Sequence, residues 1–298
     1  MDIDALSNLL MNVGSPHQYL VQDLGATAVY HYTDLGALQS IVANSDLWLT
    51  NARFSNDYEE GTHGARIAST ALAEFEADQS LAQPERDFAR SIAERSSATP
   101  PADVYICCFC RHDNLLRQWR SYGSNATGVS LAVATTQFRQ LSGPDLPNDI
   151  GLMYLWRVFY DVDKQREIVK ECVSLAHADA SKPLDERIEL ALDALRFFIP
   201  TFKNEAFKDE EEARLVFRPA PACRIKPDFR VARGMLVPYY SMKKLAAAAN
   251  QGGWRPPITS VCIGPNPNRE INCEGVKLML QASGYDGPVK VSNAPYRG

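Results

Sequence analysis

The sequence predicts an α+β fold built around a mixed sheet. Short apolar, β-prone runs are interspersed with amphipathic helical runs, without the regular strand–helix alternation that predicts a doubly wound parallel sheet. The chain has 298 residues, 45% of them hydrophobic, which is enough to bury a sizeable core. We therefore expect a single α+β domain over residues 1–298, with helical insertions at 58–98 and 163–200.

The first half of the chain opens with a short amphipathic helix, and a β-prone strand follows. Asp34 is a good helix N-cap residue, and it precedes Leu35, Leu38, Ile41 and Val42, which share one helical face. Similar patterns predict helices over 34–43, 59–81, 85–95 and 115–122, and strands over 28–32, 47–50, 104–110 and 128–133.

The second half contains two long amphipathic helices and several short strands. Helices are expected over 163–178, 184–198 and 268–282. Strands are expected over 153–160, 212–217, 229–231, 235–239, 258–263 and 289–291. The uneven placing of helices between these strands is what favours a mixed sheet.

Composition excludes some classes of function and compartment. The net charge of −5 argues against a protein that coats nucleic acid or an anionic membrane electrostatically. The first residues, MDIDALSNLLMNV, carry acids where a signal peptide carries Lys or Arg. No apolar run approaches the roughly 20 residues that span a bilayer. We expect a soluble, cytoplasmic protein with no membrane partner.

The seven cysteines include no Cys-x-x-Cys pair, so neither a zinc ribbon nor a thioredoxin-like motif is expected. Most lie in apolar runs, which indicates reduced and buried thiols. Cys108, Cys110 and His112 alternate and could share a face that binds a metal, but a fourth ligand is not evident. Buried thiols are the favoured interpretation.

Common catalytic signatures are missing from the sequence. There is no Gly-x-Gly-x-x-Gly after a strand and no Gly-x4-Gly-Lys-Ser/Thr, which excludes the usual dinucleotide and nucleoside-triphosphate loops. There is also no Gly-x-Ser-x-Gly elbow and no His-Glu-x-x-His.

A first candidate site lies on the strand over 28–32 and in the polar loop after the next strand. His31 and Thr33 are two positions apart, so they point to one face and could hold a diol such as a ribose. Asn51 and Arg53 lie in the polar loop, and loops on a rigid scaffold often carry function. The competing interpretations are a structural histidine near a strand end and, for the acids of the loop, helix capping.

A second candidate group combines a short helix with a later strand. Arg117 and Arg120 share a helix face and could hold phosphates, while Trp119 and Tyr122 could form a stacking wall. Packing of the helix on the sheet explains the two aromatic residues equally well. Glu212 lies beside a core-like strand run, where a carboxylate can stabilise a developing cation.

Taken together, the motifs resemble an uncharacterised bacterial family, a domain of unknown function often found near phage-defence genes. The resemblance rests on Tyr30-His-Tyr-Thr33, Leu47-Trp-Leu-Thr-Asn51, Phe54-Ser-Asn-Asp57 with Glu60, Gln118-Trp-Arg-Ser-Tyr-Gly123, Phe207-x-x-Glu210-x-Glu212-x-Arg214, Ile263-Gly-Pro265 and Ser292-x-x-Pro-Tyr-Arg297. It covers nearly the whole chain, and the family's name implies no activity.

The opening of the chain also resembles the ADP-ribosyltransferase fold of poly-ADP-ribose polymerases, the RNA 2′-phosphotransferase and the DarT toxins. The shared features are a strand ending in His-x-Thr, a helix and a short strand. This resemblance implies a split mixed or antiparallel sheet that forms a cleft. It also implies that His31 contacts the nicotinamide ribose, and that the backbone near Tyr32 holds the nicotinamide amide with support from Thr33. Many members have Gly where this chain has Tyr32.

The same resemblance assigns roles to later residues. Tyr122 or Trp119 would stack on nicotinamide, and Glu212 matches the catalytic glutamate. Breaking the bond between nicotinamide and ribose develops an oxocarbenium-like cation, which a nearby carboxylate stabilises. The implied activity is mono-ADP-ribosyl transfer from NAD to a macromolecule, nucleic acid or protein, by a toxin or phage-defence effector. NAD is then a substrate and no metal is required.

The sequence leaves open which arginine binds the pyrophosphate and which function the protein has. Arg53, Arg117 or Arg120 could bind the pyrophosphate of NAD bidentately. One alternative function is a metal-dependent nuclease, in which four carboxylates converge on Mg²⁺. Those carboxylates are Asp57, Glu60, Glu210 and Glu212. The other alternative is a non-catalytic sensor module that binds a nucleotide.

Overall fold

The computed structural model describes residues 1–13, 27–54, 58–98 and 103–295. Its centre is a ten-stranded sheet with the order β10-β9-β4-β1-β3-β2-β8-β7, in which β6 pairs with β3, and β5 pairs with β6. The strands are β1 Ala28–Thr33, β2 Trp48–Asn51, β3 Tyr105–Cys110, β4 Val129–Ala134, β5 Gly151–Arg157, β6 Glu212–Pro219, β7 Asp228–Ala232, β8 Met235–Ser241, β9 Ile258–Ile263 and β10 Val289–Val291.

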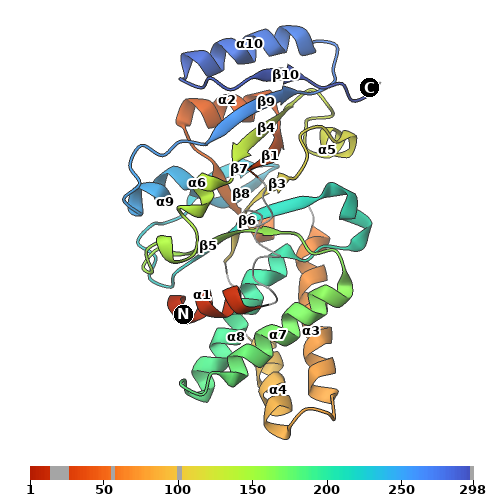
Figure 1. The fold of residues 1–298 in the computed structure, drawn as a ribbon, viewed down its shortest axis with the longest axis vertical. Helices are drawn as coiled ribbons and strands as arrows, with labels where there is room; N and C mark the ends of the chain where they lie inside the picture. The colour runs from red at the N-terminus through yellow and green to blue at the C-terminus, as the bar shows by residue number, and fades with distance from the viewer. Residues whose placement is uncertain (14–26, 55–57, 99–102, 296–298) are drawn as a thin grey trace.

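Helices cover the sheet at both ends in Figure 1. The α-helices are α1 Ile3–Asn12, α2 Leu35–Asn44, α3 Tyr58–Ala77, α4 Gln83–Ala98, α5 Leu116–Ser121, α6 Thr136–Arg139, α7 Val162–Ala178, α8 Leu184–Phe198, α9 Met242–Ala248 and α10 Arg269–Ala282. Four 3-10 helices in the described ranges are η3 Ala52–Phe54, η4 Gly143–Asp145, η5 Ile199–Thr201 and η6 Glu205–Glu210. No described helix has both the length and the apolar character needed to cross a membrane.

The predicted α+β class and mixed sheet are confirmed. The ladder between β9 and β10 is parallel, and the other described ladders are antiparallel. The predicted helices and strands recur with shifted ends. The strand expected over 153–160 runs instead from Gly151 to Arg157. The N–H of Val158 makes the last bond to β6, at the carbonyl of Glu212, and Phe159 then pairs with Phe202 instead of β6.

Two α-helices were not predicted, the short α6 and α9. Helix α9 begins after Ser241, whose hydroxyl accepts a hydrogen bond from the N–H of Lys244. A serine N-cap followed by an alanine-rich run is a helix signal, and the preceding strand pattern hid it.

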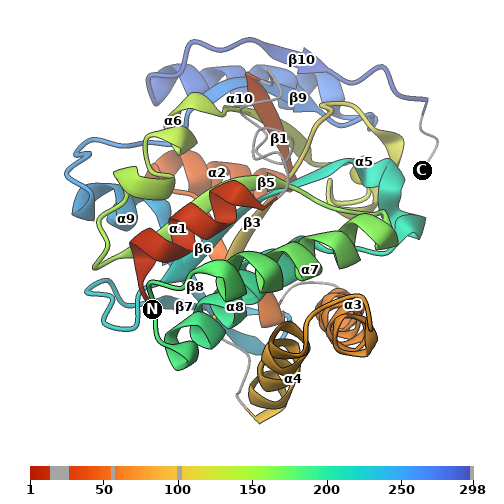
Figure 2. The same ribbon diagram turned by 60° about the horizontal axis from the view of Figure 1, so that its bottom comes forward.

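The two predicted helical insertions pack on each other. Helix α3 contacts α7, and α4 contacts α8, with α1 against both α7 and α8. Figures 1 and 2 show these five helices gathered beside β5 and β6. Their apolar faces share one core with β5, where Trp156 packs between Phe197, Phe198 and Tyr154. In the structure, the helices of these two segments and α1 form one helical layer.

Strand β3 is where the sheet divides. Strand β6 pairs along the whole of β3, so β1 and β2 must share its other edge. Strand β1 meets β3 at Tyr30 and Cys110, and β2 meets it farther along at Ile106 and Tyr105. Meanwhile β1 pairs with β4 from Ala28 to Thr33. After Tyr30, β1 therefore parts from β3, and the sheet opens between β1 and β2.

The first prediction concerns the turn that brings β4 beside β1. A Cβ on Gly128 would lie 2.1 Å from the carbonyl oxygen of Thr33 and 2.9 Å from that of Gly123. Because both neighbours are backbone atoms, we expect Gly128→Ala to lower the free energy of unfolding by about 1–3 kcal/mol. The matched control is Gly275→Ala in α10, where no described atom beyond the neighbouring residues and backbone of the same helix lies within 4 Å of the new Cβ.

In urea titrations the control should be stabilised by about 0.5–1 kcal/mol, because alanine is the better helix former. Equal free energies of unfolding for Gly128→Ala and the unchanged protein would show that the turn relaxes freely.

Candidate functional site

A small cavity of about 70 Å³ lies where β1 parts from β3. It brings together four of the residues predicted for the site, from three separate parts of the chain. Those four are His31, Tyr32, Tyr122 and Glu212. The cavity is completed by Tyr30, Cys108, Phe109, Cys110, Gln118 and Glu210.

His31 occupies the point where the β1–β3 ladder stops. Its Nδ1 lies 2.9 Å from the carbonyl oxygen of Cys108. Because a carbonyl only accepts, Nδ1 carries the proton, and Nε2 of the neutral ring is left as an acceptor. Burial lowers the pKa of His31, although the bond to Cys108 works in the opposite direction. The ring is therefore neutral at pH 7. One nitrogen holds the strands, and the other can bond a ligand hydroxyl.

Glu212 is the acidic centre of the cavity, and buried cations hold both of its carboxylate oxygens. Arg214 donates from Nε to Oε1 at 2.7 Å and from Nη2 to Oε2 at 2.9 Å. Lys203 donates from Nζ to Oε2 at 3.1 Å and also to Oε2 of Glu210 at 2.5 Å. Two carboxylates and two cations thus form one buried network.

This network fixes the charge of Glu212. Burial alone raises the pKa of a carboxyl, but the attraction of Arg214 and Lys203, together with the hydrogen bonds from Arg214, outweighs it and lowers the pKa of Glu212 to about 2. The carboxylate is consequently ionised throughout the neutral pH range.

A left-handed residue between η6 and β6 lets both carboxylates reach the same lysine. Glu211 has a φ of 42°, which few non-glycine residues adopt. The chain turns there, so Glu210 at the end of η6 and Glu212 at the start of β6 both contact Lys203. The N–H of Glu212 also donates to the hydroxyl of Tyr160 at 3.0 Å.

Of the two aromatic residues predicted to stack on a ligand, Tyr122 lines the cavity near the surface and Trp119 belongs to the core. Tyr122 is 36% exposed, whereas Trp119 is completely buried. Trp119 packs edge-to-face on Tyr32 at 4.9 Å, and its Nε1 donates to Asn114. The suggestion that Trp119 stacks on a ligand is therefore wrong in this structure, because its ring is already packed. Tyr122 remains the candidate.

Tyr32 lines the cavity with its ring, while its hydroxyl serves the fold. The hydroxyl donates to the carbonyl of His112 at 2.9 Å and accepts from the N–H of Leu115 at 3.0 Å. It thereby ties β1 to the loop between β3 and α5. Burial raises the pKa of this phenol, so it stays neutral.

Asn51 and Arg53 do not line the cavity. Asn51 is 1% exposed; its Nδ2 donates to Asp103 at 2.9 Å, and its Oδ1 accepts from the N–H of Arg53. This is a cap on the short helix η3, a local role that a sequence cannot separate from binding. The side chain of Arg53 is exposed on that helix.

Arg117 and Arg120 are also outside the lining of the cavity. The guanidinium of Arg117 lies over the ring of Phe207 at 5.4 Å, with Nε 3.7 Å from Oε1 of Glu210. Arg120 is exposed on α5. The expected role of either arginine as a pyrophosphate ligand stays a prediction.

The four carboxylates of the nuclease alternative are only partly accounted for. Asp57 and the side chain of Glu60 lie outside the described residues. Glu210 and Glu212 do come together, but the ammonium of Lys203 lies between them, within 3.1 Å of both. A lysine thus already occupies the place where this pair would hold a metal ion.

The alternating cysteines serve the fold. The thiol of Cys110 donates to the carbonyl of Glu210 and accepts from the N–H of His112, while the ring of His112 pairs with Glu211. Within the described part of the chain, no group of three or more His, Cys, Asp or Glu residues could hold a metal ion.

A second hollow, of about 210 Å³, adjoins the first through His31, which lines both. It lies in the opening between β1 and β2, and α2 forms one of its walls. The lining side chains come from β1, α2, β2, β3 and β7. They are His31, Thr33, Ala37, Ser40, Ile41, Asp46, Leu47, Trp48, Thr50, Cys107 and Arg230. We call it the Arg230 hollow.

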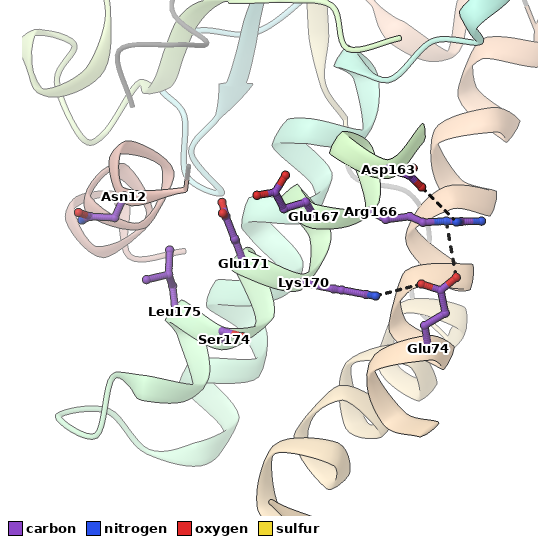
Figure 3. Close-up of a pocket in the computed structure, with 9 residues that line it drawn as sticks. All are labelled: Asn12, Glu74, Asp163, Arg166, Glu167, Lys170, Glu171, Ser174 and Leu175. Carbon is purple, nitrogen blue, oxygen red and sulfur yellow. Dashed lines mark ion pairs between the residues drawn. The ribbon is translucent and has the colours of Figure 1, made fainter. Parts of the chain in front are cut away.

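A larger hollow of about 560 Å³ lies among α1, α3 and α7, away from these residues (Figure 3). Four of its charged side chains form ion pairs with one another. Glu74 pairs with Lys170 at 3.0 Å and with Arg166 at 3.6 Å, and Arg166 also pairs with Asp163. Such pairs are typical of a solvated helix surface, so size alone does not make this hollow the site.

Sequence reasoning missed the basic half of the buried network, Lys203 and Arg214, and the roles of Tyr160 and Arg230. The alternation of Glu212 and Arg214 on one strand face was visible in the sequence. Lys203 gave no signal, because it lies in a loop and its burial depends on the turn at Glu211.

Comparisons with known proteins give a match to a family over part of the chain and no activity. A family model described as a protein of unknown function (DUF2971) matches residues 118–215. This segment runs from α5 to β6 and so includes Tyr122 and Glu212 but not His31. No curated protein and no solved structure matches the chain. The chain is thus similar over part of its length to a domain family of unknown function, and none of these comparisons connects it to ADP-ribosyltransferases.

Proposed function

We propose that this protein is an ADP-ribosyltransferase that uses NAD to modify a macromolecule. The observation that carries the proposal is the cavity at the split of the sheet, which His31 lines from β1, Tyr122 from the C-cap of α5 and Glu212 from β6. The resemblance to ADP-ribosyltransferases implies an imidazole, an aromatic ring and a carboxylate around the nicotinamide ribose, and a carboxylate there stabilises the developing oxocarbenium-like charge.

In the proposed reaction the bond between the nicotinamide nitrogen and C1′ of the ribose breaks, and its electron pair leaves with nicotinamide. The positive charge that develops on the sugar faces the carboxylate of Glu212. The acceptor's oxygen or nitrogen then bonds to C1′ and releases its proton to solvent. Nε2 of His31 accepts a hydrogen bond from a ribose hydroxyl, which orients the sugar.

The buried network affects how Glu212 can act. A carboxylate has about four lone-pair sites. Arg214 and Lys203 use three of them, and the thiol of Cys108 also bonds to Glu212. A thiol is a weak donor, so a ribose hydroxyl would replace Cys108 most easily. The remaining bonds keep the carboxylate in place, which is the preorganisation that electrostatic catalysis requires.

The direct test is incubation of the protein with NAD labelled separately in the adenylate and in the nicotinamide, with mixed RNA, DNA and protein acceptors. Transfer attaches the adenylate label to an acceptor and releases the nicotinamide label. Release without attachment would indicate NAD hydrolysis. Neither event, with any acceptor, would contradict the proposal. Addition of EDTA should leave transfer unchanged, whereas a metal-dependent nuclease would lose its activity.

Tyr122 provides a prediction about binding. If its ring stacks on nicotinamide, Tyr122→Ala should raise the KM or Kd for NAD by about 5- to 100-fold, since stacking on an aromatic side chain contributes roughly 1–3 kcal/mol. Tyr122→Phe keeps the ring and should bind within about twofold of the unchanged protein. Calorimetric titration of NAD into both variants measures the difference. Equal affinities for the Ala and Phe variants would exclude stacking by this residue.

A further inference from the structure

Arg230 is the one guanidinium among the described residues that line the Arg230 hollow. In the β7–β8 hairpin it lies opposite Val237, which is 2% exposed, while its neighbours Phe229 and Val231 are 58% and 79% exposed. Alternation along β7 thus turns Arg230 inward and its neighbours outward. The β7–β8 hairpin therefore places one positively charged side chain, that of Arg230, at the opening between β1 and β2.

The guanidinium is held in place but is not neutralised. Nη2 donates to the hydroxyl of Thr50 at 3.1 Å, and the guanidinium carbon lies 5.4 Å from the ring centre of Trp48. Nε is buried and has no hydrogen-bond partner in the described part of the chain. No ion pair joins Arg230 to a described carboxylate. A guanidinium without a described counter-ion favours an anionic ligand in the hollow that it lines.

The acid in the hollow does not fill this role. Oδ2 of Asp46 accepts from Nε1 of Trp48 at 3.1 Å, and Oδ1 accepts from the N–H of Lys243 at 2.9 Å. Asp46 therefore orients the indole and satisfies an N–H in the first turn of α9. Its place in the fold is explained without a ligand, and that of Arg230 is not.

We propose that the Arg230 hollow binds the phosphate groups of a nucleotide. Guanidinium binds phosphate through paired N–H donors, and Trp48 and Thr50 keep it in one orientation. The hydroxyls of Thr33 and Ser40 line the same hollow and can donate to phosphate or ribose oxygens. The ligand class is a ribonucleotide with a phosphate or diphosphate, and Arg230 is the residue that selects for it.

The inference deepens the proposed function, since it gives the diphosphate of the same NAD molecule a place beside its nicotinamide ribose. His31 lines both the cavity and the hollow, so one extended ligand can contact both. In this proposal Arg230 takes the role that the sequence suggested for Arg53, Arg117 or Arg120.

The test is calorimetric titration of three probes, ADP-ribose, inorganic pyrophosphate and nicotinamide, into the full chain. Arg230→Gln should weaken ADP-ribose binding by about 10- to 100-fold, as expected for loss of hydrogen bonds to a charged group. Binding of nicotinamide should not change. Arg230→Lys keeps the charge but lacks the paired donors. Its affinity for ADP-ribose should lie between that of Arg230→Gln and that of the unchanged protein. A circular dichroism spectrum of each variant confirms folding.

The matched control is Arg224→Gln, which removes an exposed arginine that pairs with Asp149 on the surface. It should bind ADP-ribose as the unchanged protein does. The inference is overturned if Arg230→Gln and the unchanged protein bind ADP-ribose equally, or if neither binds it at millimolar concentration. Binding that depends on Arg230 without any nicotinamide release would keep this inference and reject the transferase, leaving a nucleotide sensor.

Discussion

Replacement of Glu212 by glutamine should reduce the kcat for ADP-ribosyl transfer by a factor of about 10²–10³, while nucleotide binding persists. Glutamine keeps the shape of the side chain but carries no charge to face the developing oxocarbenium ion. Loss of one electrostatic contact to a transition state costs roughly 2.7–4 kcal/mol of activation free energy, which corresponds to this factor. Single-turnover rates of nicotinamide release measure it.

The substitution also disturbs the fold, so the measurement needs a control. The amide of glutamine at position 212 would place donors against Arg214 and Lys203, and breaking a buried pair costs about 3–5 kcal/mol. Rates should therefore be compared well below the melting temperature of the variant. Glu211→Gln is the matched control, since Glu211 is adjacent, half-exposed and outside the lining of the cavity.

Two further measurements separate catalysis from folding. The Glu212→Gln variant should still bind ADP-ribose with close to the original affinity, because the Arg230 hollow is intact. The Glu211→Gln variant should retain transfer within about twofold. A folded Glu212→Gln variant with more than a tenth of the original rate would remove Glu212 from the catalytic role.

Local patterns in the sequence predicted most elements of the fold. Alternation predicted the strand at Glu212, and the 3.6-residue period predicted α2 with its cap at Asp34, which accepts from the N–H of Ala37 at 2.7 Å. These signals lie within a few residues of one another. The strand partners were not predictable, because β1 pairs with β4 across about a hundred residues of intervening chain.

For the candidate site, too, local patterns were predictable and contacts between distant residues were not. His31 and Glu212 were chosen by residue type and position, and they do line one cavity. Trp119 and Asn51 were chosen on the same grounds, but their partners, Tyr32 and Asp103, are distant in sequence. Whether a polar or aromatic residue binds a ligand or packs in the core depends on such distant contacts, which a single sequence does not contain.

The buried network also predicts a large effect on stability that does not depend on any activity. Lys203 is 1% exposed, and its ammonium contacts Glu210 and Glu212. Lys203→Met would leave two buried carboxylates close together with less positive charge between them. We expect the free energy of unfolding at pH 7 to fall by about 3–5 kcal/mol, as urea titration would measure. The control Lys244→Met breaks only an exposed pair with Asp228 and should cost at most about 1 kcal/mol.

The pH dependence of this difference tests its cause. The pKa of Glu212 lies at about 2 in the folded protein, below its ordinary value of 4.5. Its ionised form thus contributes stability that is present above about pH 4.5 and is lost as the pH falls toward 2.

Without Lys203 the pKa of Glu212 should rise, because one of its two cations is gone. The variant should therefore lose less stability on acidification than the unchanged protein does. Protonation also removes the repulsion between Glu210 and Glu212. The difference in unfolding free energy between the unchanged protein and Lys203→Met should therefore narrow from pH 6 to pH 3. A difference that stays constant over this range would show that Lys203 contributes by packing and not by charge.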